Sequence, residues 1–164
     1  ALPICEVWIA FEEAYQAGKF RAIGVSNFKE ADINNILQSC TVKPMVNQIL
    51  THISNTPEAV IKYTQEKGIL VEAYSPIGHG ELLKNKQVAE IAEKYGVSVP
   101  QLGIRYCLQL GLLPIPKTAN PKHMKTNAEV DFFITDDDMK SLKTMKQIEH
   151  YGEFSKFPVF GGRI

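Results

Sequence analysis

The chain has 164 residues, a formal net charge of zero and a hydrophobic fraction of 45%, which together suit one ordinary globular domain with a real core. With a net charge of zero, the chain lacks the excess of basic residues that is typical of nucleic-acid binders. No apolar run approaches the roughly 20 residues that cross a bilayer, so we expect neither a nucleic-acid partner nor a membrane partner.

The three cysteines, Cys5, Cys40 and Cys107, are odd in number and widely spaced. This pattern argues against a disulfide framework and favours reduced thiols in a cytoplasmic protein. The apolar neighbours of Cys107 place it in the predicted core. The histidines and acidic residues lack metal-ligand spacing, so we predict no metal site.

Strands and helices alternate along the sequence. β-branched and apolar runs predict strands at residues 21–25, 44–49, 69–74 and 112–115. Helical spacing predicts helices at residues 6–17, 29–38, 57–67, 86–95, 101–110 and 136–147, with a short one opened by Asn120 and a loop at 79–84.

Several residues mark where these helices begin and end. The predicted left-handed glycines after helices are Gly18, Gly68, Gly96 and Gly111. Asn27 is the predicted N-cap of the helix over 29–38, with Glu30 completing a capping box. Ser98 and Thr135 are the predicted caps of two later helices. Trp8 and the phenylalanines are expected in the core, and the aromatic tail from Tyr151 is expected to shape a substrate pocket or to cover the domain.

Alternating strands and helices predict an α/β fold with a parallel sheet. An open doubly wound sheet and a barrel both fit this order. A complete (β/α)₈ TIM barrel needs about 250 residues, whereas this chain supplies about four βα units and starts within a helix. We therefore expect residues 1–164 to be the C-terminal half of such a barrel, with no second domain.

Four sequence segments carry a family resemblance, each at the carboxyl end of a predicted strand. They are residues 18–28, residues 46–49 followed by His52, residues 71–78, and residues 115–118 with Asn127 further on. Together and in this order they resemble the aldo-keto reductase family, in particular its bacterial-type diketogulonate reductase-like and aldehyde reductase subgroup. The resemblance covers nearly the whole chain.

The resemblance implies an NADP(H)-dependent oxidoreductase that reduces a small aldehyde or ketone to an alcohol. It implies cofactor-binding roles for residues from all four segments. Ser26, Asn27 and Gln48 would bind the nicotinamide carboxamide, Tyr74 would stack on the ring, Ser75 and Ile77 would approach the pyrophosphate, Lys117 and Thr118 would meet the ribose phosphate, and His123 and Asn127 would lie at the adenine end.

These roles agree with the chemistry of the side chains. A carboxamide offers two donors and an acceptor, which Ser26, Asn27 and Gln48 can satisfy together. Tyrosine offers an aromatic platform, and lysine is a point charge for phosphate. His123 stands where the family often has arginine, and Thr126 where it often has glutamate. Because histidine is only partly charged at neutral pH, NAD(H) stays open beside NADP(H).

The resemblance also implies what the sequence lacks. The family's catalytic tyrosine, lysine, aspartate and histidine would lie upstream, so we expect no catalytic residue in this chain and little activity from it alone. Such a half would associate with the missing N-terminal half, or with itself through exposed strand edges. The alternative is a non-catalytic half-barrel module for binding or assembly. His52 is expected to be a hydrogen-bonded structural residue.

Overall fold

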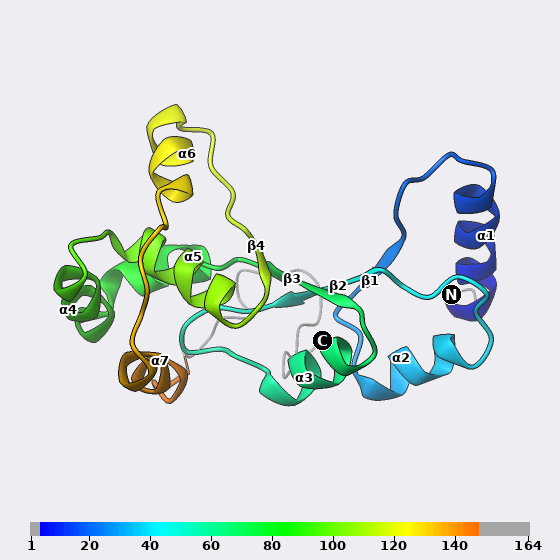
Figure 1. Cartoon of the computed structure of the whole chain (residues 1–164), viewed down its shortest axis with the longest axis horizontal. Helices are drawn as coiled ribbons and strands as arrows, with labels where there is room; N and C mark the ends of the chain where they lie inside the picture. Colours follow the sequence, from blue (N-terminus) through cyan, green and yellow to red (C-terminus); the bar gives the residue numbers. More distant parts are fainter. Residues whose placement is uncertain (1–3, 148–164) are drawn as a thin grey trace. The chain divides into compact units, whose positions relative to one another are not determined.

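The computed structural model describes residues 4–147, in which helices and strands alternate as the sequence predicts (Figure 1). In chain order the elements are α1 (Ile4–Gln16), β1 (Gly24–Ser26), α2 (Glu30–Leu37), β2 (Val46–Leu50), α3 (Glu58–Glu66), β3 (Leu70–Tyr74), the 3₁₀ segment η1 (Gly78–Lys84), α4 (Lys86–Lys94), α5 (Val99–Gln109), β4 (Leu113–Ile115), α6 (Pro121–Ala128) and α7 (Asp136–Lys143). None of the helices in this range is both long enough and apolar enough to cross a membrane.

The strands form one sheet in the order β1-β2-β3-β4. Pairing is parallel: Ser26 lies opposite Gln48 in β1 and β2, and Tyr74 lies opposite Ile115 in β3 and β4. Gly24 permits the first pairing, because a Cβ at this position would lie only 2.7 Å from the carbonyl oxygen of Val46. The parallel α/β arrangement with four βα units is therefore confirmed.

Most predicted helix signals are confirmed. The four glycines that follow helices, Gly18, Gly68, Gly96 and Gly111, all have φ between +64° and +74°. Ser98 Oγ accepts a hydrogen bond from the Gln101 amide in α5 at 3.4 Å. Thr135 Oγ1 accepts one from the Asp138 amide in α7, also at 3.4 Å. The helix α7 ends at Lys143, short of the predicted residue 147.

The predicted cap at Asn27 is wrong. Asn27 has φ +57°, and its amide donates to the Gln48 carbonyl oxygen at 2.9 Å, so the residue continues the backbone pairing with β2 just beyond β1. The helix starts two residues further on, after Lys29, whose amide donates to the Asp32 carboxylate at 2.9 Å. Asp32, not Glu30, therefore satisfies the first turn of α2.

The described chain forms two compact units: residues 4–49 with 58–71, and residues 50–57 with 72–147. In the first unit Trp8, Ile23 and Ile36 are buried together. The Trp8 indole donates to the Val42 carbonyl oxygen at 3.0 Å. The carboxylate of Glu12, also buried, accepts the amides of Thr41 and Val42 at 2.6 Å each. These bonds hold the segment that leads into β2.

The second unit is built around α5, which packs against α4, α6, β4 and η1. Its buried side chains include Leu102, Tyr106 and Cys107. Burial raises the pKa of Cys107 to about 12, so this thiol stays protonated and its predicted core position is confirmed. Gly103 lets α5 approach the preceding loop, because a Cβ there would lie 2.9 Å from the Pro76 carbonyl oxygen.

The prediction that the phenylalanines lie in the core is wrong for Phe11, Phe20 and Phe133, which are 40%, 46% and 63% exposed. The rings of Phe11 and Phe20 meet edge to face, 6.4 Å apart, outside the buried Trp8. Beyond Phe133, both backbone groups of Ile134 bind the Gln109 side chain, at 2.7 and 2.9 Å. That pairing turns Ile134 inward and Phe133 outward.

Two further expectations concern irregular segments. The predicted loop at residues 79–84 is largely the 3₁₀ segment η1, in which His79 and Gly80 have φ of +52° and +88°. These left-handed residues interrupt the helical turns, which explains why no helical period is visible in the sequence. The aromatic tail from Tyr151 lies outside the described residues.

Candidate functional site

The first group of predicted cofactor residues lies in the first unit, where β1 and β2 end. Ser26 Oγ donates to the Gln48 carbonyl oxygen at 3.1 Å, and the Asn27 amide donates to the same oxygen at 2.9 Å. The parallel register therefore brings Gln48 together with the adjacent Ser26 and Asn27, which lie far from it in the sequence. We call these three residues the amide group.

Asn27 carries an unused hydrogen-bonding atom. Its Oδ1 is buried and has no hydrogen-bond partner among the described residues. A buried polar oxygen without a donor costs about 1–3 kcal/mol, so such atoms call for an explanation. The amino group of a carboxamide is a donor that fits this oxygen. The amide group therefore suits the nicotinamide end of a dinucleotide.

Asn47, which the sequence analysis gave no role, fixes the position of the amide group. It is fully buried, and its side chain accepts the Phe28 amide at 3.3 Å and donates to the Phe28 carbonyl oxygen at 3.0 Å. It also donates to Thr64 Oγ1 at 3.4 Å. These bonds hold the residue after Asn27. The available signal was the strand alternation, which turns Asn47 inward beside the site residue Gln48.

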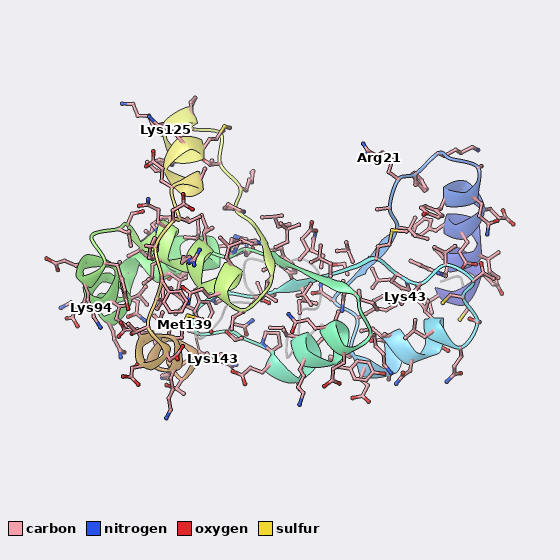
Figure 2. All side chains as sticks on the ribbon, viewed as in Figure 1. Arg21, Lys43, Lys94, Lys125, Met139 and Lys143 are labelled. Carbon is pink, nitrogen blue, oxygen red and sulfur yellow. The ribbon has the colours of Figure 1, made fainter. Side chains whose placement is uncertain are left out.

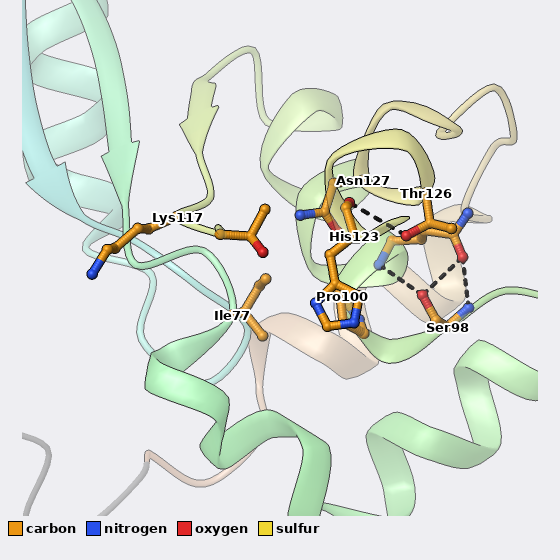
Figure 3. A pocket seen from close by; sticks show the side chains of 9 residues that line it. Ile77, Ser98, Pro100, Lys117, His123, Thr126 and Asn127 are labelled. Carbon is orange, nitrogen blue, oxygen red and sulfur yellow. Dashed lines mark hydrogen bonds between the residues drawn. The ribbon is translucent and has the colours of Figure 1, made fainter. Parts of the chain in front are cut away.

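The second group lies in the second unit and forms a pocket of about 280 Å³ (Figure 3). Five of the predicted cofactor residues line it: Ile77, Lys117, Thr118, His123 and Asn127. Four other residues complete the lining: Ser98, Pro100, Gln101 and Thr126. We call this space the α5–α6 pocket. Its volume is near the lower end of the range for small-molecule sites.

Local hydrogen bonds shape the α5–α6 pocket. Gln101 Nε2, at the start of α5, donates to the Glu129 carbonyl oxygen beyond α6 at 2.8 Å. Thr118 Oγ1 accepts the Asn120 amide at 3.1 Å, and Asn120 Oδ1 in turn caps α6. Because residues four apart share one side of a helix, His123 and Asn127 both face the pocket. A lysine, a hydroxyl, an imidazole and an amide suit a phosphate beside a nucleoside.

Tyr74 and Ser75 do not line the α5–α6 pocket. Ser75 follows β3 with φ +52°, and its Oγ lies 3.2 Å from His79 Nε2. The Gly78 amide donates to the Ser75 carbonyl oxygen at 2.8 Å, which closes a turn after the strand. The turn and the close approach of α5 to Pro76 place Ile77 beside the start of α5.

Sequence reasoning missed Ser98, Pro100 and Gln101 as site residues and treated them only as a helix start. They do form that start: Ser98 caps α5, and Pro100 lies in its first turn. The same residues therefore cap the helix and line the pocket. The capping pattern in the sequence indicates only the first of these two roles.

His52 is fully buried, and its Nδ1 bonds to the neighbouring Ile53 carbonyl oxygen.

A parallel α/β sheet with polar residues at the carboxyl ends of its strands is typical of ligand-binding α/β proteins, both barrels and open sheets. The model of the aldo/keto reductase family matches residues 1–147. The chain therefore belongs to the aldo/keto reductase family.

Relatives and solved structures agree with this assignment. The chain is similar to an uncharacterized oxidoreductase of Schizosaccharomyces pombe, with 43% identity over 88% of this chain and 54% of that protein. It is 38% identical to a glyoxal reductase of Bacillus subtilis over 90% of this chain and 54% of that protein. The chain thus spans about half the length of the curated relatives that it matches.

Two solved structures show the same fold. The aldose reductase of Schistosoma japonicum matches with a TM-score of 0.86 and 33% identity, over 92% of this chain and 50% of that one. An aldo-keto reductase of Bombyx mori in complex with NADP matches with a TM-score of 0.78 and 32% identity, over 85% of this chain and 49% of that one. The predicted partial TIM barrel is therefore confirmed.

Proposed function

We propose that this chain is the cofactor-binding, C-terminal half of a barrel that reduces aldehydes or ketones to alcohols with NADPH. The observation that carries the proposal is the buried, unpartnered Oδ1 of Asn27 beside Ser26 and Gln48. A bound nicotinamide would supply the hydride for such a reduction. The chain's own residues would orient it: Asn27 Oδ1 would accept from the carboxamide and so select which face of the ring is presented.

The α5–α6 pocket supports the same proposal from the other end of the dinucleotide. Lys117 and Thr118 offer a charge and a hydroxyl to the phosphate on the adenosine ribose, and Asn127 offers an amide to the adenine. Tyr74 would cover the nicotinamide ring, and Ser75 and Ile77 would meet the pyrophosphate. NADP bound to the Bombyx mori relative supports this choice of cofactor.

Carbonyl reduction also needs an acid that protonates the developing alkoxide. We assign no residue between positions 4 and 147 to that step, and propose that the acid belongs to a companion half of the barrel. The outer strands of the sheet, β1 and β4, are where such a half or a second copy would pair. The three free cysteines support a reducing, cytoplasmic setting.

Binding measurements with the 164-residue chain test the proposal. We expect NADPH to bind, and we expect Asn27→Ala to weaken binding about tenfold, as the loss of one buried hydrogen bond does. The variant should weaken the binding of reduced nicotinamide mononucleotide by the same factor and leave the affinity for adenosine 2′,5′-bisphosphate unchanged. Asn35→Ala, an exposed change in α2, is the control. The proposal would be contradicted if the chain does not bind NADPH, or if Asn27→Ala leaves the affinity for NADPH unchanged.

A turnover assay tests the missing acid separately. With the pure chain we expect no carbonyl-dependent loss of NADPH absorbance above the uncatalysed rate. Steady turnover would show that the acid lies within these 164 residues. Light scattering after size exclusion is expected to show self-association, and a well-behaved monomer would count against pairing through β1 and β4.

A further inference from the structure

The helix α6 carries three of the residues that line the α5–α6 pocket, His123, Thr126 and Asn127 (Figure 3). None of the residues of α6 (Pro121–Ala128) is buried, and its one large apolar side chain, Met124, is 53% exposed. Burial of an apolar face is what ordinarily fixes a helix against its neighbours. Because α6 buries no such face, its position depends on hydrogen bonds at its two ends.

The bonds at the start of α6 are local. Asn120 Oδ1 accepts the Lys122 amide at 3.0 Å, and Thr118 Oγ1 accepts the Asn120 amide at 3.1 Å. Each bond joins residues two apart, so both shape the turn into the helix without joining it to another element. Among the helices, α6 packs chiefly against α5. The bonds that fix α6 on α5 lie at its other end.

The backbone that follows α6 is bound by two side chains of α5. Gln101 and Arg105 are four residues apart and therefore lie on the same side of that helix. Gln101 Nε2 donates to the Glu129 carbonyl oxygen at 2.8 Å, and Arg105 Nη1 donates to the Val130 carbonyl oxygen at 3.3 Å. These two bonds join the end of α6 to α5.

The direction of the Arg105 side chain is fixed by Gln109, one turn further along α5. Arg105 Nε donates to Gln109 Oε1 at 3.1 Å, and Gln109 in turn binds both backbone groups of Ile134. The half-buried guanidinium thus uses two of its donors at once, one on Gln109 and one on the Val130 carbonyl oxygen. Gln101 lines the α5–α6 pocket, but Arg105 does not. Arg105 can therefore affect a ligand there only through the residues that it holds.

We propose that Arg105 is a positioning residue for the adenosine end of the dinucleotide. It holds the backbone after α6 on α5, and so fixes Asn127 in the pocket wall without touching the ligand. The inference rests on the proposed function and adds a residue that acts on the same site from outside it. Lys117 and Thr118 follow β4 and precede α6, so the phosphate contact does not depend on Arg105. The adenine contact at Asn127 does.

Hydrogen exchange and fragment binding with the full chain test the proposal. Arg105→Met keeps the aliphatic stem and removes the donors. Amides of residues 121–130 should then exchange about three- to tenfold faster, as the loss of one net hydrogen bond allows. 5′-AMP and adenosine 2′,5′-bisphosphate should both bind about three- to tenfold more weakly, so that the ratio of their dissociation constants stays unchanged. Reduced nicotinamide mononucleotide should bind as it does to the wild type.

Two further variants separate positioning from charge and from general stability. Arg105→Lys keeps the positive charge but lacks the planar fork that serves Gln109 and Val130 together. It should behave as Arg105→Met does, and it carries the same test if Arg105→Met does not fold. Asn85→Ala removes the cap of α4 in the same unit, and it should change neither the exchange of α6 nor the two affinities.

Three results would overturn the inference. Arg105→Met could leave the exchange of α6 and both affinities unchanged, Asn85→Ala could weaken the fragments equally, or Arg105→Lys could restore binding, as a role of charge alone requires. A charge effect would also weaken the bisphosphate more than 5′-AMP.

The same measurements distinguish this inference from the proposed function. If NADPH binds in an Asn27-dependent way but Arg105→Met has no effect, the proposed function stands and the inference fails. A wild-type chain that binds none of these ligands would contradict the proposed function, whereas faster exchange confined to α6 in Arg105→Met would still support the hold of Arg105 on this helix.

Discussion

The side chains that cross-link the first unit and the helix caps of the second unit show two different uses of polar side chains. In the first unit the buried side chains Glu12 and Asn47 bind backbone groups of segments far away in the sequence. In the second unit Asn85 and Thr135 act locally at the starts of α4 and α7, although Gln101 and Gln109 also bind distant backbone groups there. Glu12 and Asn47 cross-link their unit, whereas the caps define single elements.

This difference matches the ligand chemistry proposed for each unit. A neutral carboxamide is recognised through hydrogen bonds alone, so its partners must be held in place and kept from water. Asn47 holds the residue after Asn27 in this way. A phosphate is recognised mainly by charge, which acts at longer range and tolerates an exposed site. Lys117 and His123, which line the α5–α6 pocket, are both exposed and fit this mode of recognition.

The largest difference in unfolding free energy is expected between two asparagine replacements, one in each unit. Asn47→Ala leaves both backbone groups of Phe28 and the Thr64 hydroxyl without this partner, so we expect it to lower the free energy of unfolding by about 3–4 kcal/mol. Asn85→Ala removes an exposed cap of the Gln87 and Val88 amides and should cost about 1 kcal/mol.

Urea unfolding at pH 7, with Asn35→Ala as the exposed control, measures this contrast. Equal effects of Asn47→Ala and Asn85→Ala would show that the two units do not differ in how their polar groups contribute. Asn47→Ala should also weaken binding of reduced nicotinamide mononucleotide, since it releases the residue after Asn27. Unchanged binding in folded Asn47→Ala would show that the amide group does not depend on Asn47.

The local elements were predictable because local chemistry sets them. Gly18 and Gly96 end helices through a backbone conformation that a side chain disfavours, and Ser98 marks a helix start through a bond three residues away. Such signals lie within a few residues of the element that they define. The parallel sheet followed from the alternation of strands and helices.

The errors arise where a contact joins distant segments. Asn27 reads as a helix cap, but its amide pairs with Gln48, and that pairing moves the start of α2. Glu12 of α1, to which the sequence analysis gives no role, is buried with its carboxylate against the amides of Thr41 and Val42. Similarly, Gln101 enters the α5–α6 pocket because its side chain reaches the backbone beyond α6. No pattern among neighbouring residues in the sequence indicates these pairings.

The second unit also contains a buried titratable side chain, His52, whose contribution to stability depends on pH. Burial lowers the pKa of His52 from its ordinary value of 6.5 to about 4, with the nearby His79 charge acting in the same direction and the bond to the Ile53 carbonyl oxygen opposing. The unfolded chain takes up this proton below about pH 6.5, whereas the folded chain does so only near pH 4. Stability is therefore lost as pH falls between these values.

The corresponding loss is about 3 kcal/mol at most, from 1.36 kcal/mol per pKa unit. Unfolding free energies measured at pH 7, 6, 5 and 4.5 should fall for the wild type by more than for His52→Gln, whatever the variant's overall stability. Parallel pH profiles for the two proteins would show that His52 is not the titrating group.

The smallest expected effect comes from the link between α4 and α7 in the second unit. Lys94, which is labelled in Figure 2, projects from α4. Its Nζ lies 2.7 Å from Asp138 Oδ2, and the hydroxyls of Tyr95 and Thr135 also donate to this carboxylate. The bond from Lys94 is the main reason that the pKa of Asp138 lies below its ordinary value of 3.8. A carboxylate of lowered pKa stabilises the fold above that ordinary value and loses the effect as pH falls through the native pKa.

Because this pair lies at the surface, water and salt screen most of its attraction. We expect Asp138→Asn to lower the thermal midpoint at pH 7 by only about 1–2 °C. The difference from the wild type should shrink in 1 M salt and again as pH falls below about 4. The shift in thermal midpoint could instead be as large for Asp138→Asn as for Asn47→Ala. The exposed ion pair between α4 and α7 would then stabilise the second unit as strongly as the buried Asn47 stabilises the first, and the two kinds of polar contact would not differ in energy.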